Sequence, residues 1–257
     1  MKRLLWLAVF LLCVSGVVLC SLYFWVARDV PPLNSEFDLQ TRMKQRVEAE
    51  RKSLGGTMTV NGGIDFQPPD RSKLPTDLVV LYLSQLGCPG YLQTLREDGA
   101  AWSWRVVDGA LFHGAPAGDG QCERALAMQV AAELDIRDPL QQSIAARRIH
   151  AFLTKDQLLA FALSGLVFAR GVVGPDAAAR DLFGRPLEQL RLSELAELVL
   201  AFPAPVGGYW DDLKTCKNPS LLRQGRDGIL ERLGHDGLVP EERVKSAQAQ
   251  PLACLHP

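Results

Sequence analysis

Four cysteines carry the first chemistry that the sequence suggests, because thiols can pair with one another or bind a metal ion. They are Cys88, Cys122, Cys216 and Cys254, and all of them follow a long apolar segment at the start of the chain. An even number of cysteines in an oxidising compartment favours disulfide bonds, although four cysteines allow three connectivities. A zinc site is the alternative, but the chain has no C-x-x-C spacing and its four histidines are scattered. We therefore expect disulfides and no metal site, provided that this part of the chain is exported.

The apolar segment at the start of the chain indicates in which compartment the remaining residues lie. Residues 4–26 include no charged residue, and a helix of that length would span about 34 Å, more than the roughly 30 Å of a bilayer core. Lys2 and Arg3 precede the segment, whereas Arg28 is followed at once by Asp29. The excess of positive charge before the segment predicts a cytoplasmic N-terminus and an exported remainder.

Two other interpretations of this segment stay open. A cleaved signal peptide usually has an apolar stretch of about 7 to 15 residues that ends in small residues, whereas this one continues into Tyr23, Phe24 and Trp25. Cys20 would suit a lipoprotein, but a lipid-modified cysteine normally follows a small residue, and Leu19 precedes this one. A retained transmembrane anchor is the prediction.

The rest of the chain predicts one mostly helical domain. We expect a cytoplasmic tip at 1–3, an anchor at 4–26, a linker at 27–35 and a domain at 36–257, since roughly 230 residues fit one sizeable core. Ser35 is placed to cap a helix whose apolar positions include Leu39, Met43 and Val47. Turn residues dominate Gly55–Pro75, and beyond Pro75 the apolar residues follow a helical period with no run of alternating strands. A net charge of −1 gives no reason to expect nucleic acid.

The segment from Leu153 to about Ala247 carries a more specific pattern. It begins LTKDQLLAFALSGLVFARGVVGPDAAARDLFGRPLEQLRLSELAELVLAFPAP, and it resembles three consecutive motifs of glycosyltransferase family 51, the peptidoglycan transglycosylases. Further along, GRDGILERLGHDGLVPEE is similar to the family's R-R-x-x-V-L-x-R-M segment, with Arg226 at the second arginine. Upstream the likeness weakens, although GAAW is similar to the family's G-F-D-W through Gly99 and Trp102. The resemblance implies an all-α, lysozyme-like domain with a larger and a smaller lobe.

The family's chemistry requires a glutamate as general base, and cations that neutralise a pyrophosphate leaving group. Its first motif, E-D-x-x-F, would place that glutamate at Leu86, beside Gln85, or at Gly90, depending on the alignment. The segment LPTDLVVLYL resembles the family's helix before this motif. The nearby Glu97 is a candidate for the catalytic acid only if this match and that of Gly99 are abandoned. A solvated loop carboxylate is its other interpretation.

The next three motifs keep their place but lose much of their chemistry. In the second, Arg124 and Ala125 replace the serine and threonine, while Gln129 matches a glutamine. In the third, R-K-x-x-E becomes Asp138, Pro139 and, at the second glutamate position, Gln142, which cannot exchange a proton as a glutamate can. In the fourth, Lys155 is kept, and the later glutamate, tyrosine and asparagine become Ala160, Ala162 and Ser164.

Several polar residues could still hold a glycan or a lipid phosphate, or could simply lie exposed on helices and loops. These candidates for substrate binding are Gln129, Lys155, Ser164, Arg170 and Arg226. We expect Arg147 and Arg148 to face solvent. Tyr209 and Trp210 lie where the family has its S-R-Y-N-P loop, and we expect packing in preference to sugar contact. Because the family's first two motifs approach one cleft, the resemblance favours pairing Cys88 with Cys122. Cys216 lies in a late loop and Cys254 in a C-terminal tail, and we favour pairing these two with each other.

Two functions follow from the resemblance. The first is a pseudoenzyme of the bacterial inner membrane, with an extracytoplasmic domain that binds lipid II or glycan strands, or serves as a scaffold for cell-wall synthesis proteins. The alternative is an active peptidoglycan glycosyltransferase that polymerises lipid II with an acid that the alignment misplaces. We expect no cofactor, and a divalent cation only if the protein is active.

Overall fold

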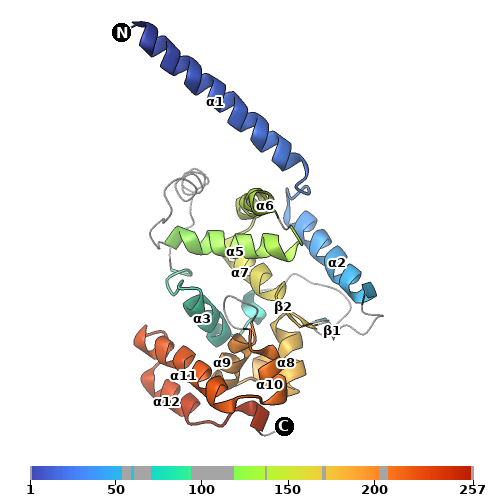
Figure 1. The fold of residues 1–257 in the computed structure, drawn as a ribbon. Coiled ribbons are helices and arrows are strands. Elements are labelled where there is room, and N and C mark those ends of the chain that lie inside the picture. The colour runs from blue at the N-terminus through green and yellow to red at the C-terminus, as the bar shows by residue number, and fades with distance from the viewer. Residues whose placement is uncertain are drawn as a thin grey trace.

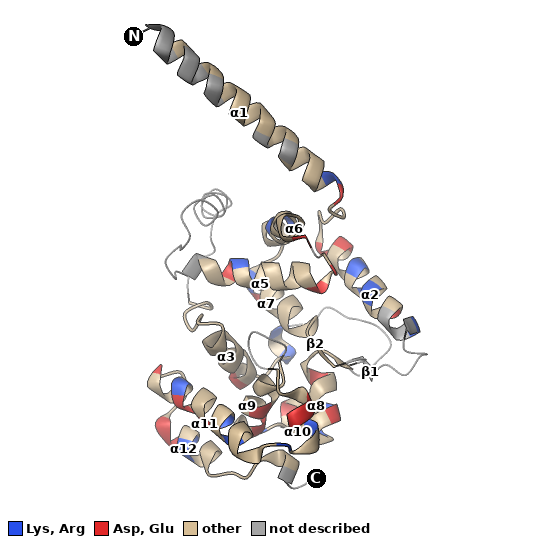
Figure 2. Ribbon diagram, in the orientation of Figure 1, with Lys and Arg blue, Asp and Glu red and all other residues tan. Residues whose placement is uncertain are grey.

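The chain is mostly helical, as expected, in a computed structural model that describes residues 2–53, 59–60, 71–93, 119–136, 138–169, 172–202 and 208–255. It begins with one continuous helix, α1 (Lys2–Arg28), which projects away from the other elements in Figure 1. Helix α1 has charged residues only at its two ends, Lys2 and Arg3 at the start and Arg28 at the last position, and Figure 2 draws the ribbon between these ends in tan or grey. Within the described residues, no helix meets the length and apolarity that crossing a membrane requires.

A short connection joins α1 to α2 (Glu36–Ser53). The Oγ of Ser35 accepts a hydrogen bond from the backbone N–H of Asp38 at 3.2 Å, which confirms the predicted cap of α2. The guanidinium of Arg148 donates to the carbonyl oxygens of Ala27, Val30 and Pro31 at 3.1 to 3.4 Å. The expectation that Arg148 faces solvent is therefore wrong, because this side chain satisfies carbonyl groups at the end of α1.

In the three helices that follow residue 118, the first packs against both of the others. They are α5 (Asp119–Glu133), α6 (Pro139–Phe152) and α7 (Lys155–Ser164). Helix α6 starts at Asp138, whose carboxylate accepts from the N–H groups of Leu140 and Gln141 at 3.0 and 2.9 Å. Helix α7 starts with a capping box between Thr154 and Gln157. Local sequence thus fixes where both helices begin.

A second group of helices surrounds α9 (Leu192–Leu200), every residue of which is buried. Figure 1 shows this group at the end of the molecule opposite α1. The group includes α3 (Thr76–Gln85), α8 (Pro175–Phe183), α10 (Trp210–Thr215), α11 (Pro219–His235) and α12 (Glu241–Gln248). Short 3₁₀ turns lie at Arg71–Lys73, Leu187–Gln189 and Ala253–Leu255. Aromatic rings in tilted and edge-to-face contact extend the core, with the ring centroid of Phe202 lying 5.5 Å from that of Tyr82 and 5.2 Å from that of Phe168.

A small sheet, which the sequence did not predict, lies between these groups. It has the order β1 (Thr59–Val60), β3 (Val172–Val173), β2 (Val167–Ala169), with β1 parallel and β2 antiparallel to β3. After β3 the chain turns into α8 at Gly174, whose φ of 83° favours glycine. Gly165 meets a different demand, since a Cβ there would lie 2.6 Å from the Met43 methyl group of α2. Glycine therefore allows α2 to pack against the end of α7.

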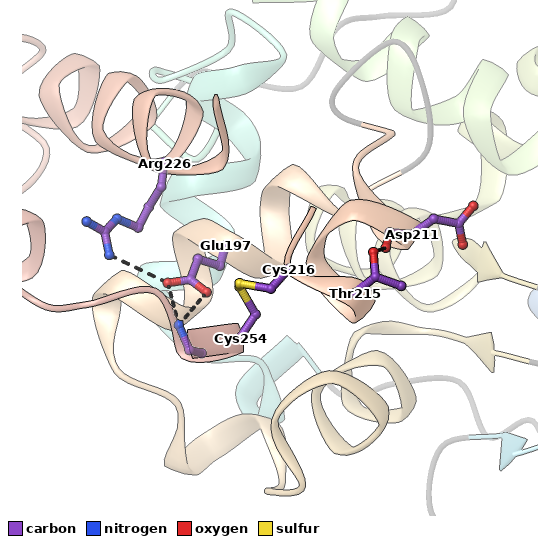
Figure 3. Close-up of a disulfide and its surroundings, with 7 residues drawn as sticks. Glu197, Asp211, Thr215, Cys216, Arg226 and Cys254 are labelled. Carbon is purple, nitrogen blue, oxygen red and sulfur yellow. Dashed lines mark hydrogen bonds and ion pairs between the residues drawn. A yellow bond between two sulfur atoms is a disulfide. The ribbon is translucent and has the colours of Figure 1, made fainter. Parts of the chain in front are cut away.

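Two disulfides join segments far apart in the chain. Cys88 and Cys122 lie 5.8 Å apart between Cα atoms and link the turn after α3 to α5. Cys216 and Cys254 lie 5.3 Å apart and link the end of α10 to the last 3₁₀ turn (Figure 3). This is the connectivity that the family resemblance favours. The two remaining cysteines, Cys13 and Cys20, are free thiols on α1.

Replacing Cys216 and Cys254 together by serine should lower the free energy of unfolding by about 3 to 4 kcal/mol, because the bond restricts a loop of about 38 residues in the unfolded chain. Urea unfolding of the detergent-solubilised chain measures this difference. Alkylation of the unreduced, unfolded wild-type chain should label only Cys13 and Cys20. Four or more labelled thiols would contradict the two bonds.

Candidate functional site

The helices that carry the second, third and fourth motifs meet at a buried carboxylate. Glu123 on α5 is 2% exposed, and its Oε2 lies 2.5 Å from Nε2 of His150 on α6. The ammonium group of Lys155, at the start of α7, lies 3.6 Å from the other oxygen of Glu123. A charge removed from water in this way is stable only when it is paired. Glu123 therefore connects three helices.

Lys155 is engaged by Tyr91 as well. Its ammonium lies 4.3 Å from the centre of the Tyr91 ring and donates to the Tyr91 carbonyl oxygen. In return, the Tyr91 hydroxyl donates to the Lys155 carbonyl oxygen at 3.0 Å. The Lys155 side chain is 16% exposed. This retained cation of the fourth motif thus ties α7 to the turn after α3, and only a small part of it could reach a ligand.

Gln129 also makes hydrogen bonds between helices. Its side-chain oxygen accepts from the Tyr82 hydroxyl of α3, and its Nε2 donates to the carbonyl oxygen of Ala162 on α7 at 3.1 Å. Burial raises the pKa of Tyr82 well above its ordinary value, so the hydroxyl stays a donor at neutral pH. Ser164, at the end of α7, is 2% exposed. The expectation of ligand contact is therefore wrong for Ser164, because burial hides it. For Gln129 it stays a prediction, although both polar ends of this side chain already bond between helices.

The third motif has become the start of a helix. Asp138, where the family has an arginine, caps α6, and Pro139, where it has a lysine, fills the first helical position. Gln142, at the second glutamate position, donates from Nε2 to the carbonyl oxygen of Ile136. These residues now satisfy backbone groups at the entry of α6. Positions that resemble a pyrophosphate site by alignment serve local structure here.

Arg226 lies in the second group of helices and is fully buried, at 0% exposure. Its guanidinium donates to the carbonyl oxygens of Gln248 and Gln250 at 3.1 and 2.8 Å, and lies 2.8 Å from a carboxylate oxygen of Asp227. Its Nη1 also lies 3.6 Å from Glu197 of α9 (Figure 3). The expectation that Arg226 binds substrate is therefore wrong, because no part of this side chain reaches the surface.

Glu197 holds the same C-terminal segment from the other side. Its carboxylate accepts from the N–H of Ala253 at 3.1 Å. Burial raises the pKa of Glu197 from 4.5 to about 7, although that hydrogen bond and the Arg226 charge act in the opposite direction. Glu197 therefore changes charge near neutral pH inside the protein.

Comparison with known proteins settles the family. A family model described as Transglycosylase matches residues 101–233, which is more than half of the chain. The chain belongs to the transglycosylase family. The resemblance to peptidoglycan transglycosylases, first carried by the motifs after Leu153, is confirmed.

Individual transglycosylase relatives differ in how much of them the chain covers. Penicillin-binding protein 1A of Rickettsia typhi is 29% identical over 120 residues, which are 47% of this chain and 15% of that protein. Penicillin-binding protein 1A of Pseudomonas aeruginosa is 23% identical over 98% of this chain and 30% of that protein. A biosynthetic peptidoglycan transglycosylase of Ralstonia nicotianae is 25% identical over 83% of this chain and 89% of that protein.

The position of the first motif's glutamate is judged from the sequence alone. Gln85, Leu86 and Gly90, where its glutamate could fall, all precede the family match and none is acidic. Glu97 also precedes the match, and both Glu97 and Arg170 lie outside the described residues. The first acid within the match is Asp108, which no motif alignment singled out. Glu97 and Asp108 are thus the two acids to test for a catalytic role.

Trp210 packs as expected, whereas the Glu123–His150 pair was not expected from the sequence. Trp210 is 8% exposed and lies 5.7 Å from Phe168 between ring centroids, which confirms packing for this aromatic residue. Glu123 and His150 were missed because they lie 27 residues apart on different helices, and no local spacing marks them. A buried acid and a histidine on otherwise apolar helix faces were the only available signal.

The raised pKa of Glu197 predicts a pH dependence of stability. Because the folded protein holds this proton more tightly than the unfolded chain does, the free energy of unfolding should fall as pH rises from 4.5 to about 7. The Glu197→Gln variant lacks this step, so it should gain up to about 3 kcal/mol relative to wild type between pH 4.5 and pH 8. Urea unfolding at several pH values measures the difference. An unchanged difference across that range would contradict the assignment.

Proposed function

We propose that the protein is a membrane-anchored, transglycosylase-like component of the bacterial cell envelope that binds lipid II or glycan strands without polymerising them. The observation that carries this proposal is the use of motif residues in internal contacts. Asp138 and Gln142 bond to backbone groups, and Gln129 and Lys155 bond between helices. Residues committed to the fold in this way are poorly placed to act on a substrate.

Glycosyl transfer needs two kinds of group that these positions do not supply. A general base contributes about 10² to 10⁴ in rate, and Gln85, Leu86 and Gly90, where the first motif's glutamate could fall, have no carboxylate for that role. Loss of a group that stabilises the leaving pyrophosphate costs roughly another 10² to 10³, and Asp138 brings a negative charge where a cation is needed. Both deficits act on the transition state. Binding of the ground state is a separate demand and can survive them.

The anchor and the exported domain belong to the same proposal. The uncharged segment 4–26, preceded by Lys2 and Arg3, supports a single crossing with a cytoplasmic N-terminus. Two disulfides in the domain fit an oxidising, extracytoplasmic compartment better than the cytoplasm. A larger and a smaller lysozyme-like lobe, with a ligand between them, is the arrangement that we propose for the helix groups around α5 and α9.

A lipid II polymerisation assay tests the proposal directly. The detergent-solubilised full chain should give no glycan strands under conditions where the Ralstonia nicotianae relative elongates them, while still retaining lipid II in a binding assay. Changing Arg170 to alanine should weaken that retention several-fold, because Arg170 lies in the matched segment and a guanidinium pairs well with phosphate oxygens. Preparation of the chain from salt-washed membranes tests the anchor in the same experiment, since an unanchored chain would be lost in the wash.

Two variants make the opposite result informative. Elongation by wild type that disappears in Glu97→Gln or Asp108→Asn would identify the missing acid and an active glycosyltransferase. Elongation that survives both changes would also contradict the proposal. If the chain shows no elongation and no lipid II retention, the binding function is overturned, although the family resemblance stays intact.

A further inference from the structure

A cavity of about 650 Å³ lies between α8, α9 and the C-terminal segment, and none of its lining residues belongs to α5, α6 or α7. Its walls include Phe183 at the end of α8, Arg185 in the following turn, Arg191 and Ser193 at the start of α9, and Gln250 and Pro251 after α12. This volume is within the range of about 300 to 1,000 Å³ that is typical of small-molecule sites. The question is which chemistry its polar groups would select.

The C-terminal wall of the cavity is firmly held. Arg226 donates to the Gln250 carbonyl oxygen at 2.8 Å, and Glu197 accepts from the Ala253 N–H at 3.1 Å. The Cys216–Cys254 bond fixes the chain immediately beyond (Figure 3). Buried charges and a covalent bond therefore keep this wall in place, and the cavity is a built feature of the fold.

The side-chain acceptors that line the cavity already have donors. One carboxylate oxygen of Glu194 accepts from the guanidinium of Arg185, and the other accepts from the backbone N–H of Arg191 at 2.8 Å. The amide oxygen of Gln250 accepts from the Ser193 hydroxyl at 2.5 Å. Glu194 is thus occupied in capping α9 and pairing with one arginine.

Donors remain in excess. The Arg191 side chain is exposed, and in the described part of the chain its guanidinium pairs with no carboxylate. With its oxygen fixed by Ser193, Gln250 presents its amide N–H groups without a bond to another described residue. Two arginines against one glutamate also leave the cavity positive. A ligand that only accepts hydrogen bonds and carries negative charge matches these groups, and an ionised carboxylate is such a group.

We propose that this cavity binds a carboxylate carried by a small apolar body, such as the C-terminal end of a short peptide. The carboxylate pairs with the Arg191 guanidinium and accepts from the Gln250 amide. Small alkyl groups lie against Leu182, Phe183 and Pro251 on the apolar side. The site is separate from the motif residues on α5, α6 and α7, so it does not depend on lipid II binding or on glycosyl transfer.

Saturation-transfer NMR on the detergent-solubilised full chain tests the site, with N-acetyl-alanyl-alanine as the probe and its C-terminal amide as the matched neutral ligand. The acid should bind saturably, and the amide at least about tenfold more weakly, which corresponds to about 1.4 kcal/mol. Arg191→Gln should weaken binding of the acid by about tenfold or more, and Arg191→Lys by less, because lysine keeps the charge but not the planar fork.

Arg180→Gln is the matched control. Arg180 is also an exposed arginine close in sequence, but it pairs with Asp176 at 3.0 Å and does not line the cavity. Unchanged binding in this variant and unchanged thermal unfolding in both would support the site. Equal binding of acid and amide, no saturable binding, or equal losses in the two arginine variants would overturn it. Stronger competition by inorganic phosphate than by the dipeptide would overturn the choice of a carboxylate.

Discussion

The buried carboxylate of Glu123 is the constraint on which the arrangement of α5, α6 and α7 depends. At 2% exposure it has lost almost all of its hydration, which costs several kcal/mol unless charged or hydrogen-bonding groups replace the water. His150 and Lys155 are two groups that do so, one from each neighbouring helix. Moving either helix away would leave a charge in the interior without these contacts. The contacts of Glu123 therefore fix both the position of the three helices and the position of the motif residues that these helices carry.

Other substitutions in the motifs act in the same direction. An aspartate and a proline that start α6 stand where the resemblance places two cations, and the amide of Gln142 closes the turn before that helix. Glycines and small residues of the transglycosylase pattern keep their structural tasks, since Gly174 and Gly184 adopt positive φ and Ala178 and Ala179 are fully buried. The scaffold of the family is kept, and side chains at positions that glycosyl transfer would need form structural contacts within it.

Sequence patterns predicted the features that depend on local or repeated signals. The cap at Ser35, the helical periodicity beyond Pro75 and the family itself each leave such a signal, and all three are confirmed. The sheet was missed because strands of two or three residues are too short to show an alternating pattern. Arg226 was misassigned because its burial depends on a C-terminal segment more than twenty residues away. Contacts between distant helices, such as Glu123 with His150, are set by tertiary packing and leave no spacing to read.

The central claim is that the polar residues at the motif helices stabilise the fold and do not act on a ligand. A double-mutant cycle between Glu123→Gln and His150→Gln, measured by urea unfolding of the solubilised full chain, tests it most directly. The account predicts that each single change destabilises the protein and that the two are coupled by about 1 to 3 kcal/mol. A coupling energy near zero, with full stability in both single variants and loss of lipid II retention in either, would contradict it.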